Sequence, residues 1–377
     1  MTGVVELTGE LIAARSPNPP GDERAVAGVV REALSAAGLP EPRVIARERE
    51  RPNLLTTLDF GPGGRHLVLC GHLDTKPVGG AAWSVDPFAA TIDGDRLYGL
   101  GSTDMKGAVA AMIAAAGRLD LGAGRLSLLL VADEENGAAY GARHVAPMVE
   151  ADAIVIGEPC GRETDFDRLP LVSRGIARWR AVARGEQGHS SLSDGPRNAG
   201  VEAARAVVSL ADGPPLDAPP NPDGLEGWEL TLNPALRFDG GVGYGVLPAE
   251  IAALCEVRLL PGTDRGALTA ALLERLDGAE LEWDEVDWLE GTAVAAGDPI
   301  AAAVRRSAER VLGRAPADAV FPGTTDATWL AGAAPTLPAW GPGLLSRAHA
   351  ADEWVSVAAL HTAVDLYAEL AREYCTG

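Results

Sequence analysis

The stretch LVLCGHLDT, Leu67–Thr75, is an apolar run that ends in two side chains able to bind a metal, His72 and Asp74. Two later runs have the same form. Arg125–Glu135, RLSLLLVADEE, and Asp152–Pro159, DAIVIGEP, are each apolar over most of their length and end in carboxylates. Short apolar runs of this kind are typical of buried strands. The sequence therefore predicts three buried strands that finish in ligand-type residues.

The carboxylates at the ends of the second and third runs are Glu134, Glu135 and Glu158. In open α/β sheets, ligands bind outside the carboxyl ends of the strands, so the three termini are expected to converge on one crevice. A histidine combined with several carboxylates suits a divalent metal such as zinc, with manganese or cobalt as alternatives. The pattern therefore predicts a metal site at one edge of a sheet.

The chain has 377 residues, of which 47% are hydrophobic, enough for two domains of ordinary size. No uncharged apolar stretch is long enough to span a membrane, and the N-terminus MTGVVELTGELIAARS carries acids where a signal peptide has a basic flank. We therefore expect a soluble, cytoplasmic protein. Its four cysteines, without CxxC spacing, argue against a disulfide framework and against a thiolate zinc site.

The net charge of −21 bears on the kind of partner. Proteins that bind phosphate backbones or anionic lipid need clustered lysine and arginine, so we expect neither nucleic acid nor a membrane as a partner. A small molecule is the expected partner instead. Most of the acidic side chains are expected to be solvated surface, and only some of them to serve cation binding.

In the N-terminal part of the chain, strand patterns alternate with helix patterns such as Glu23–Ala37 and Met105–Leu119, which is the rhythm of a βαβ sheet. We expect a doubly wound α/β catalytic domain formed by residues 1–170 together with residues 288–377. The two pieces are joined in this prediction because the C-terminal piece is too short to bury a core alone.

The rhythm changes in residues 171–287, which we expect to form a second domain inserted into the first. Six elements are expected there in the order βαββαβ, a small ferredoxin-like sheet with two helices on one face. Their ranges are 174–184, 198–210, 228–238, 250–259, 265–276 and 280–286. Further helix patterns follow at Pro299–Leu312 and Val355–Tyr374.

Two further ligand candidates stand outside the three strands. Asp104 opens the helix pattern DMKGAVAAMIAAAGRL, where an acid is also a common cap. His349 lies in a loop just before the last helix, where a histidine is more often inert than a ligand. Asp74 lies two residues beyond His72 and on the same face of a strand, where a carboxylate can fix the orientation of the imidazole.

Glu134 and Glu135 are adjacent, and on a regular strand they would face opposite ways. At most one of them is then a direct ligand, unless the chain turns at this point. One metal ligand and one general base is a natural division of the pair. A solvated strand end is the alternative interpretation.

Seven short motifs occur in the order and approximate spacing of a known family. They are GHLDTKP (Gly71–Pro77), GSTDMKG (Gly101–Gly107), DEE (Asp133–Glu135), GEP (Gly157–Pro159), GHSS (Gly188–Ser191), GTTDA (Gly323–Ala327) and AHAADEW (Ala348–Trp354). With them the chain resembles the dinuclear zinc peptidase and deacylase family that includes acetylornithine deacetylase, succinyl-diaminopimelate desuccinylase, aminoacylase and glutamate carboxypeptidase. The resemblance covers essentially the whole chain, and SPNPPGDE, Ser16–Glu23, is similar to that family's N-terminus.

The resemblance implies two zinc ions per chain, with cobalt or manganese as substitutes. Asp104 would bridge the two ions. His72 and Glu158 would complete one metal site, and Glu135 and His349 would complete the other.

The same resemblance implies roles for residues around the metals. Asp74 would orient His72, and Glu134 would be the general base that takes a proton from the bridging water and later delivers it to the leaving amine. His189, in the inserted domain, would stabilise the oxyanion, in dimeric relatives at the active site of the other subunit. The family also tends to have a cis peptide bond after the bridging aspartate, here Asp104–Met105.

Substrate recognition is the least specific part of the resemblance. Arg258 matches a family arginine that contacts the substrate carboxylate, and Thr325 lies in a stretch, Gly323–Ala327, that matches a loop lining the same pocket. From its strand position alone, Arg258 can also be an ordinary surface arginine. Relatives often read Asn-Val-Ile-Pro where this chain has GVLP, so Gly245 stands in place of a substrate-contacting asparagine, a departure that points to an unusual substrate.

These observations predict a zinc-dependent hydrolase that cleaves the amide bond of an N-acyl amino acid, of the deacetylase or desuccinylase type. A homodimer through the inserted domain is expected. A dipeptidase or carboxypeptidase that uses the same site is the near alternative. A catalytically silent metal-binding scaffold is a further hypothesis, and the presence of Glu134 beside a complete ligand set weighs against it.

Overall fold

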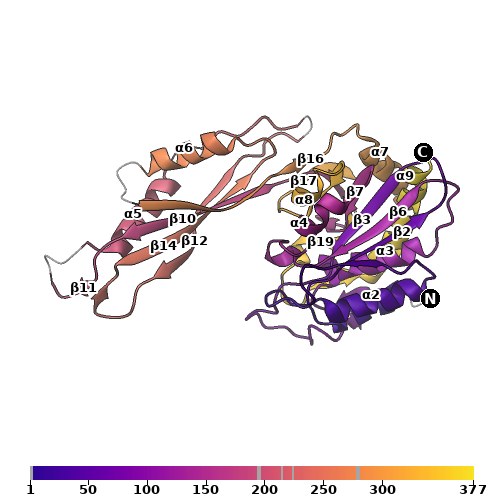
Figure 1. The fold of residues 1–377 in the computed structure, drawn as a ribbon, viewed down its shortest axis with the longest axis horizontal. Coiled ribbons are helices and arrows are strands. Elements are labelled where there is room, and N and C mark those ends of the chain that lie inside the picture. The colour runs from indigo at the N-terminus through magenta and orange to yellow at the C-terminus, as the bar shows by residue number, and fades with distance from the viewer. Residues whose placement is uncertain (1–2, 193–196, 214, 223–224, 277–280) are drawn as a thin grey trace. The chain divides into compact units, whose positions relative to one another are not determined.

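A computed structural model describes residues 3–192, 197–213, 215–222, 225–276 and 281–377 (Figure 1). The chain folds into two compact units. The first comprises Met1–Val172, Ala293–Phe321 and Thr325–Gly377, and the second comprises Ser173–Thr292 and Pro322–Thr324. The inserted unit thus begins and ends a few residues later than the predicted range 171–287, and the loop Pro322–Thr324 joins it from the C-terminal part of the chain.

A six-stranded mixed sheet forms the centre of the first unit, in the order β1-β2-β6-β3-β7-β18. Strands β6, β3, β7 and β18 run parallel, whereas β2 is antiparallel to both of its neighbours. The bounds are β1 (Arg43–Ile45), β2 (Asn53–Asp59), β3 (His66–His72), β6 (Arg125–Val131), β7 (Ala153–Ile156) and β18 (Thr336–Leu337). The predicted α/β sheet is therefore present, with an antiparallel edge that the strand patterns did not reveal.

Helices cover both faces of this sheet (Figure 1). On one face α3 and α9 pack on β3 and β6, with α1 and α7 against them. On the other face α4 and α8 share a core with alternate strand residues such as Cys70, Leu129 and Ile156. The bounds are α1 (Val4–Ala13), α2 (Arg24–Ala36), α3 (Gly107–Ala116), α4 (Ala142–Val145), α7 (Pro299–Leu312), α8 (Ala327–Leu330) and α9 (Val357–Cys375). Because both of its faces are covered, β3 is buried at every position.

Smaller sheets, β20-β5-β4, β16-β9-β17 and β19-β8, complete the strand pairing around the main sheet. Their strands are β4 (Thr91–Asp93), β5 (Arg96–Tyr98), β8 (Pro159–Gly161), β9 (Arg168–Ser173), β16 (Thr292–Ala293), β17 (Ala317–Phe321), β19 (Gly341–Leu344) and β20 (Trp354–Ser356). No helix in the described part of the chain is long and apolar enough to cross a membrane.

The second unit is built on a four-stranded antiparallel sheet in the order β12-β14-β10-β15. Its elements follow the predicted order βαββαβ: β10 (Gly175–Arg184), α5 (Ala199–Ala211), β12 (Thr231–Gly240), β14 (Glu250–Leu259), α6 (Arg265–Arg275) and β15 (Leu281–Leu289). Glu280, with which the predicted last strand begins, lies outside the described residues. A short ribbon of β11 (Gly188–His189) and β13 (Val246–Leu247) is an additional feature.

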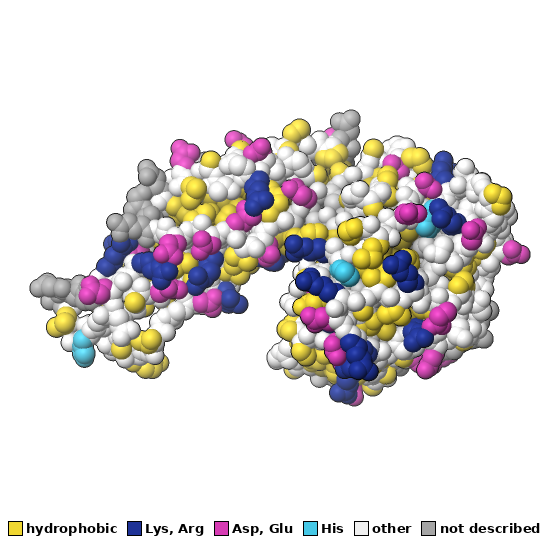
Figure 2. All heavy atoms as spheres, viewed as in Figure 1, with side chains coloured by type: hydrophobic (Ala, Val, Ile, Leu, Met, Phe, Trp, Pro, Cys, Tyr) yellow, Lys and Arg dark blue, Asp and Glu magenta, His cyan; other side chains and the backbone are white. Residues whose placement is uncertain are grey.

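Both helices of the second unit cover one face of its sheet. Leu210 of α5 and Leu272 of α6 share a buried cluster with Trp179 of β10 and Val257 of β14. Side chains at the alternate strand positions, which point away from the helices, include many charges, and in Figure 2 basic and acidic side chains are interspersed over this unit. Some of these side chains form ion pairs across the sheet, such as Arg180 with Glu250 and Arg184 with Glu282. Both partners of these pairs are exposed, so each pair contributes little to stability.

Candidate metal centre

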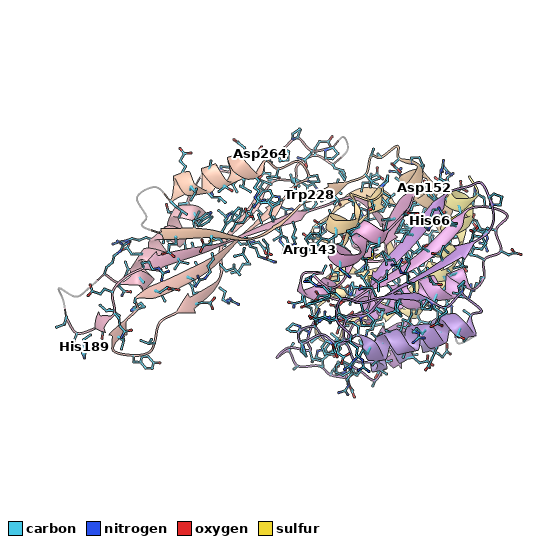
Figure 3. The ribbon with its side chains drawn as sticks, in the orientation of Figure 1. His66, Arg143, Asp152, His189, Trp228 and Asp264 are labelled. Carbon is cyan, nitrogen blue, oxygen red and sulfur yellow. The ribbon has the colours of Figure 1, made fainter. Side chains whose placement is uncertain are left out.

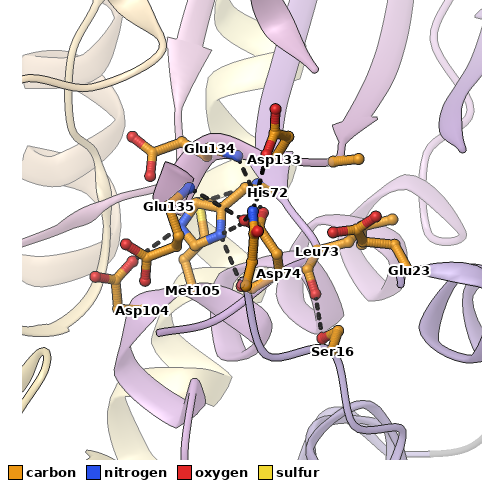
Figure 4. Close-up of polar contacts among 12 residues, drawn as sticks. Ser16, Glu23, His72, Leu73, Asp74, Asp104, Met105, Asp133, Glu134 and Glu135 are labelled. Carbon is orange, nitrogen blue, oxygen red and sulfur yellow. Dashed lines mark hydrogen bonds and ion pairs between the residues drawn. The ribbon is translucent and has the colours of Figure 1, made fainter. Parts of the chain in front are cut away.

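The carboxyl ends of three neighbouring parallel strands bring the predicted ligands together. Figure 4 shows His72, Asp104, Glu134 and Glu135 close to one another. His72 is the last residue of β3, Glu134 and Glu135 follow β6, and Glu158 follows β7. His72 Nε2 lies 3.5 Å from Glu158 Oε1. Ligand atoms of His72, Glu134 and Glu158 all lie within 4.8 Å of one another. The convergence expected from the three apolar runs is therefore present.

Asp104 stands between two histidines. Its Oδ1 lies 2.9 Å from His72 Nε2, and its Oδ2 lies 3.2 Å from His349 Nε2. The same His349 nitrogen is 3.1 Å from Glu135 Oε1. Each oxygen of one carboxylate therefore faces a different imidazole, and the cluster has two halves that share Asp104.

The donors of this cluster fit divalent cations. Ligand atoms of His72, Asp104 and Glu135 lie within 4.8 Å of one another, a second group beside the one that contains Glu158. Imidazole nitrogens and carboxylate oxygens are the donors that zinc and related metals bind. Buried carboxylates also need positive charge, and Lys76 supplies some of it here, with Nζ 3.0 Å from Glu135 Oε2.

The protonation of the cluster shows the same need for positive charge. Hydrogen bonds to Asp104 and Glu135 raise the pKa of His349 to about 10. Burial alone would lower the pKa of His72, but hydrogen bonds to Asp104 and Glu158 raise it well above its ordinary value. Burial alone would raise the pKa of Asp104, but hydrogen bonds from both imidazoles hold it far below its ordinary range. Protons on the imidazoles thus occupy positions that metal ions would take.

Glu134 and Glu135 lie in a single helical turn, Glu134–Asn136, and not on a strand. The preceding Asp133 has φ 65°, a left-handed conformation that ends β6 and turns the chain. Asp74 holds the turn, because its Oδ1 accepts the N–H of Glu134 at 3.2 Å and its Oδ2 accepts the N–H of Glu135 at 3.1 Å. The turn lets both adjacent acids reach the cluster, which a regular strand would forbid.

Asp74 orients His72 through its main chain. His72 Nδ1 donates to the Asp74 carbonyl at 3.0 Å, whereas the Asp74 carboxylate is 3.7 Å away. Because a carbonyl can only accept, Nδ1 carries a proton and Nε2 is the nitrogen left to bind a metal. We expected the carboxylate to make this contact, but its oxygens bind the main chain of the Glu134 turn instead.

A buried ionic network that sequence patterning did not reveal adjoins this turn through Asp74 and Asp133. Arg51 Nη2 donates to Asp133 Oδ1 at 2.6 Å, and Arg51 Nε forms an ion pair with Glu23 Oε2 at 3.0 Å. The Asn18 amide donates to Asp133 at 2.9 Å and to Asp74 at 2.8 Å. The network therefore ties both supports of the Glu134 turn to the N-terminal part of the chain.

Asp104 does not open a helix, contrary to the predicted pattern Met105–Leu119. It lies in an irregular turn, Ser102–Lys106, and α3 begins only at Gly107. The backbone angles of Asp104 (φ −124°, ψ 92°) fall outside the helical region. The N-cap position of α3 is Lys106, so the Asp104 carboxylate does not cap that helix. The peptide bond between Asp104 and Met105 is cis, as the family resemblance implies.

His189 is an exposed residue of β11 in the second unit (Figure 3). Its Nδ1 accepts the main-chain N–H of Ser191 at 3.2 Å, which assigns the proton of the neutral ring to Nε2. Gly245 lies beside it, because its carbonyl accepts the N–H of Ser190 at 3.0 Å and Val246 pairs with His189. Gly245 has φ 77°, a conformation that asparagine also tolerates. The departure from the family pattern therefore lies next to the predicted oxyanion donor.

Arg258 has an internal partner that the sequence analysis did not identify. Its Nε lies 2.8 Å from Glu256 Oε1, and Glu256 is buried and also pairs with Arg178 at 2.9 Å. This ion pair is a structural reason for an arginine in the strand, although the Arg258 side chain remains 31% exposed. Thr325 is buried, and its hydroxyl accepts the N–H of Ala327 at 3.3 Å at the start of α8. The role of Thr325 in substrate binding stays a prediction.

Comparison with known proteins is consistent with this geometry. The model of peptidase family M20/M25/M40 matches residues 68–373. Succinyl-diaminopimelate desuccinylase of Stenotrophomonas maltophilia (strain R551-3) is 32% identical over 388 residues, which covers 98% of each protein. The protein of the same name from Parvibaculum lavamentivorans is 30% identical over 397 residues, 99% of this chain and 96% of that relative.

Solved structures show the same fold over nearly the whole chain. An M20 family metallo-carboxypeptidase from Sulfolobus solfataricus superposes with a TM-score of 0.82 at 20% identity, covering 99% of both chains. Human carnosine dipeptidase 1 gives 0.80 at 17% identity, covering 99% of this chain and 96% of that one. The α/β fold and the metal-ligand cluster together define a metal-dependent amidohydrolase. The chain belongs to peptidase family M20/M25/M40.

Proposed function

We propose that this chain hydrolyses the amide bond of a small N-acyl amino acid, with two zinc ions held by the cluster that shares Asp104. The carboxylate of Glu134 carries the proposal. It lies within reach of His72 and Glu158, yet it makes no hydrogen bond or ion pair among the described residues. A general base requires a carboxylate that lies beside the metal ligands and is not itself engaged by another side chain. The ligands would be His72 and Glu158 for one ion, Glu135 and His349 for the other, and Asp104 for both.

The side chains of the site divide the chemistry among them. Bound zinc would supply Lewis-acid polarisation of the scissile carbonyl and would acidify water. Burial raises the pKa of Glu134 well above its ordinary value, which suits a group that accepts a proton near neutral pH and then returns it to the leaving amine. His189 would donate its Nε2–H to the carbonyl oxygen as that oxygen becomes negative.

The names of the similar proteins support an N-acyl amino acid as the class of substrate. Proteins named succinyl-diaminopimelate desuccinylase align over 98% of this chain at 32% identity. An N-succinyl amino acid is therefore the first candidate, and an N-acetyl amino acid is the second. Both carry the free carboxylate that an arginine such as Arg258 would recognise.

A substrate panel tests the proposal. Zinc-loaded protein would be assayed for amine release from N-succinyl-diaminopimelate, N-acetylornithine and simple dipeptides, with Glu134→Ala protein prepared in parallel to expose contaminating hydrolases. We expect the highest kcat/KM for an N-acyl amino acid. Preference for dipeptides would favour the peptidase alternative, and no hydrolysis of any member by fully loaded protein would favour the silent scaffold.

Replacing Arg258 by alanine should raise KM for substrates that bear a free α-carboxylate far more than for their amides, because a charge-assisted hydrogen bond is lost only in the former. Glu256 keeps its pair with Arg178 at 2.9 Å, so the change should not leave a buried carboxylate alone. The exposed Arg180 lies on the same strand face as Arg178 and is the matched control. Equal losses on both substrate types would show that Arg258 is structural.

Replacing His189 by alanine should lower turnover by about 10²–10³-fold, the usual effect of removing one oxyanion donor. Zinc content should stay unchanged, since His189 is not among the proposed ligands. Ser191→Ala is the matched control, because it removes the hydroxyl that lies 2.8 Å from Nδ1 but leaves the imidazole in place. Full activity of the His189 variant would dismiss its catalytic role.

We further propose that the chain forms a homodimer through the second unit. Its strand β12 is an edge strand, and α5 exposes Val201 and Val208, which are features that a second copy could cover. Mixing inactive His189→Ala with inactive Glu134→Ala chains should then restore partial activity, if His189 acts across the dimer. Hybrid dimers that remain inactive would place His189 and Glu134 of one site in the same chain.

A further inference from the structure

Glu353 is a buried carboxylate that binds three main-chain N–H groups of the segment carrying Asp104. Its side chain is almost completely buried, with 1% of the residue exposed. Oε2 accepts the N–H of Gly101 at 2.9 Å, and Oε1 accepts those of Thr103 at 2.9 Å and of Asp104 at 3.0 Å. Among the described residues it forms no ion pair, and these hydrogen bonds offset part of the cost of its burial.

The irregular backbone explains why these N–H groups need a side-chain acceptor. The angles of Asp104 and Met105 are not helical, so the turn Ser102–Lys106 does not supply regular helical partners. Gly101, with φ 80°, starts the turn, and a Cβ at that position would lie 2.6 Å from Thr75 Cγ2. The shape of the turn therefore depends on a contact from elsewhere in the chain, and Glu353 provides it.

Two further bonds join the same segments. The N–H of Gly99 donates to the Glu353 carbonyl at 2.9 Å, and Thr103 Oγ1 donates to the Trp354 carbonyl at 2.6 Å. Glu353 comes four residues after His349, whose Nε2 lies 3.2 Å from Asp104 Oδ2. These contacts therefore connect the segment that carries Asp104 to the segment that carries His349.

We propose that Glu353 is a positioning residue that fixes the half of the cluster formed by Asp104, Glu135 and His349. The other half differs in its support, because His72 ends a buried strand and Glu158 follows one. Loss of Glu353 should therefore weaken metal binding most at the His349 half, where both Asp104 and His349 belong to the segments that it joins. The His72 half should weaken less, because it shares only Asp104. The inference rests on the proposed two-metal function and concerns a residue that touches neither ion.

The test uses metal binding by the full chain and not activity. Apo protein would be titrated with zinc by calorimetry, and with Co²⁺ by its absorption spectrum. Wild type should show two binding events. In Glu353→Gln, which keeps the size of the side chain but replaces one of its two acceptor oxygens by an NH2 donor, one event should weaken by about 10–100-fold, the usual effect of losing a partner that supports a metal ligand. The other event should weaken less, because only one of its ligands, Asp104, lies in the segment that Glu353 binds.

Matched variants separate this role from general destabilisation. In Asp95→Asn both events should persist, although Asp95 also binds the segment that follows Glu353, accepting from Ser356 Oγ at 2.6 Å and from the N–H of Ala358 at 2.8 Å. Thr103→Val removes the hydrogen bond from Thr103 Oγ1 to the Trp354 carbonyl and leaves the Glu353 side chain in place, so it should give the same unequal loss to a smaller extent. This variant decides the question if Glu353→Gln does not fold.

His349→Ala identifies the affected half. In that background Glu353→Gln should cause a smaller loss at the remaining site than it causes at the weakened site of the otherwise wild-type chain. The positioning role alone would be overturned if wild type shows two binding events and the Glu353 variant loses metal affinity equally at both of them, or at neither. A single event in wild type would overturn the two-metal function and the role of Glu353 with it.

Discussion

Treatment with a chelator should abolish amide hydrolysis, and added zinc should restore it, with cobalt or manganese as substitutes. We expect a complete loss because the proposed base has no activated water and no polarised carbonyl to act on without the metals. Elemental analysis of zinc-reconstituted protein should give up to two ions per chain. The site offers two sets of donors joined by Asp104, whose two oxygens face His72 at 2.9 Å and His349 at 3.2 Å.

Single variants check that the metal occupies this cluster. His349→Ala should lower the zinc content, whereas His361→Ala, an exposed position of α9, should leave it unchanged. Only trace metal at every loading, together with activity that chelators do not affect, would contradict the metal hypothesis as a whole.

Replacing Glu134 by alanine should reduce turnover by about 10²–10⁴-fold or more, the usual effect of removing a positioned general base. Both metals should stay bound, because the proposed ligand set does not include this side chain. The measurement is kcat on the best substrate of the panel, together with zinc content and circular dichroism of the same preparation.

The neighbouring glutamate provides the contrast. Glu135→Ala should weaken metal binding, because Glu135 Oε1 lies 3.1 Å from His349 Nε2. The two residues share one turn and one support, the Asp74 carboxylate, so the pair differs mainly in what each side chain reaches. If Glu134→Ala lost metal while Glu135→Ala kept it, the two roles would be reversed.

The elements with strong local signals could be predicted from the sequence. Strand β3 is buried on both faces, so its continuous apolar run predicted a strand although polar and apolar residues do not alternate in it. Helix α7 spans Pro299–Leu312 as predicted, because Asp298 caps its first turn and proline occupies its first position. The ends of the apolar runs then placed five ligand-type residues at one edge of the sheet, namely His72, Asp74, Glu134, Glu135 and Glu158. Their roles in binding and catalysis remain predictions.

The contacts that shape the site could not be predicted, because they join residues far apart in the sequence. Arg51 and Asp133 are 82 positions apart, and Glu353 and Gly101 are 252 apart. A periodic pattern carries no information about such pairs. The best available signal was local: Asn18 lies between prolines in SPNPP, a rigid setting in which a polar side chain is held in one direction.

The turn at Glu134 shows a different limit. Period-two alternation assigns adjacent acids to opposite faces only while the strand continues, and β6 ends at Val131. Asp133, which follows, has a left-handed conformation. Aspartate tolerates this conformation better than most residues but also occurs in many others, so an aspartate at this position does not by itself predict a turn.

The buried network beside that turn determines how much of the chain a fragment must contain if the metal centre is to be moved into another protein. The family match begins at residue 68, and every proposed ligand lies within it. Asn18, Glu23 and Arg51 lie before it, and they hold the two aspartates on which the Glu134 turn rests. A fragment or chimera cut at the family boundary would therefore carry all of the chemistry and lack the anchor of its base. Grafting this centre into another scaffold requires the segment from Asn18 to Arg51 as well.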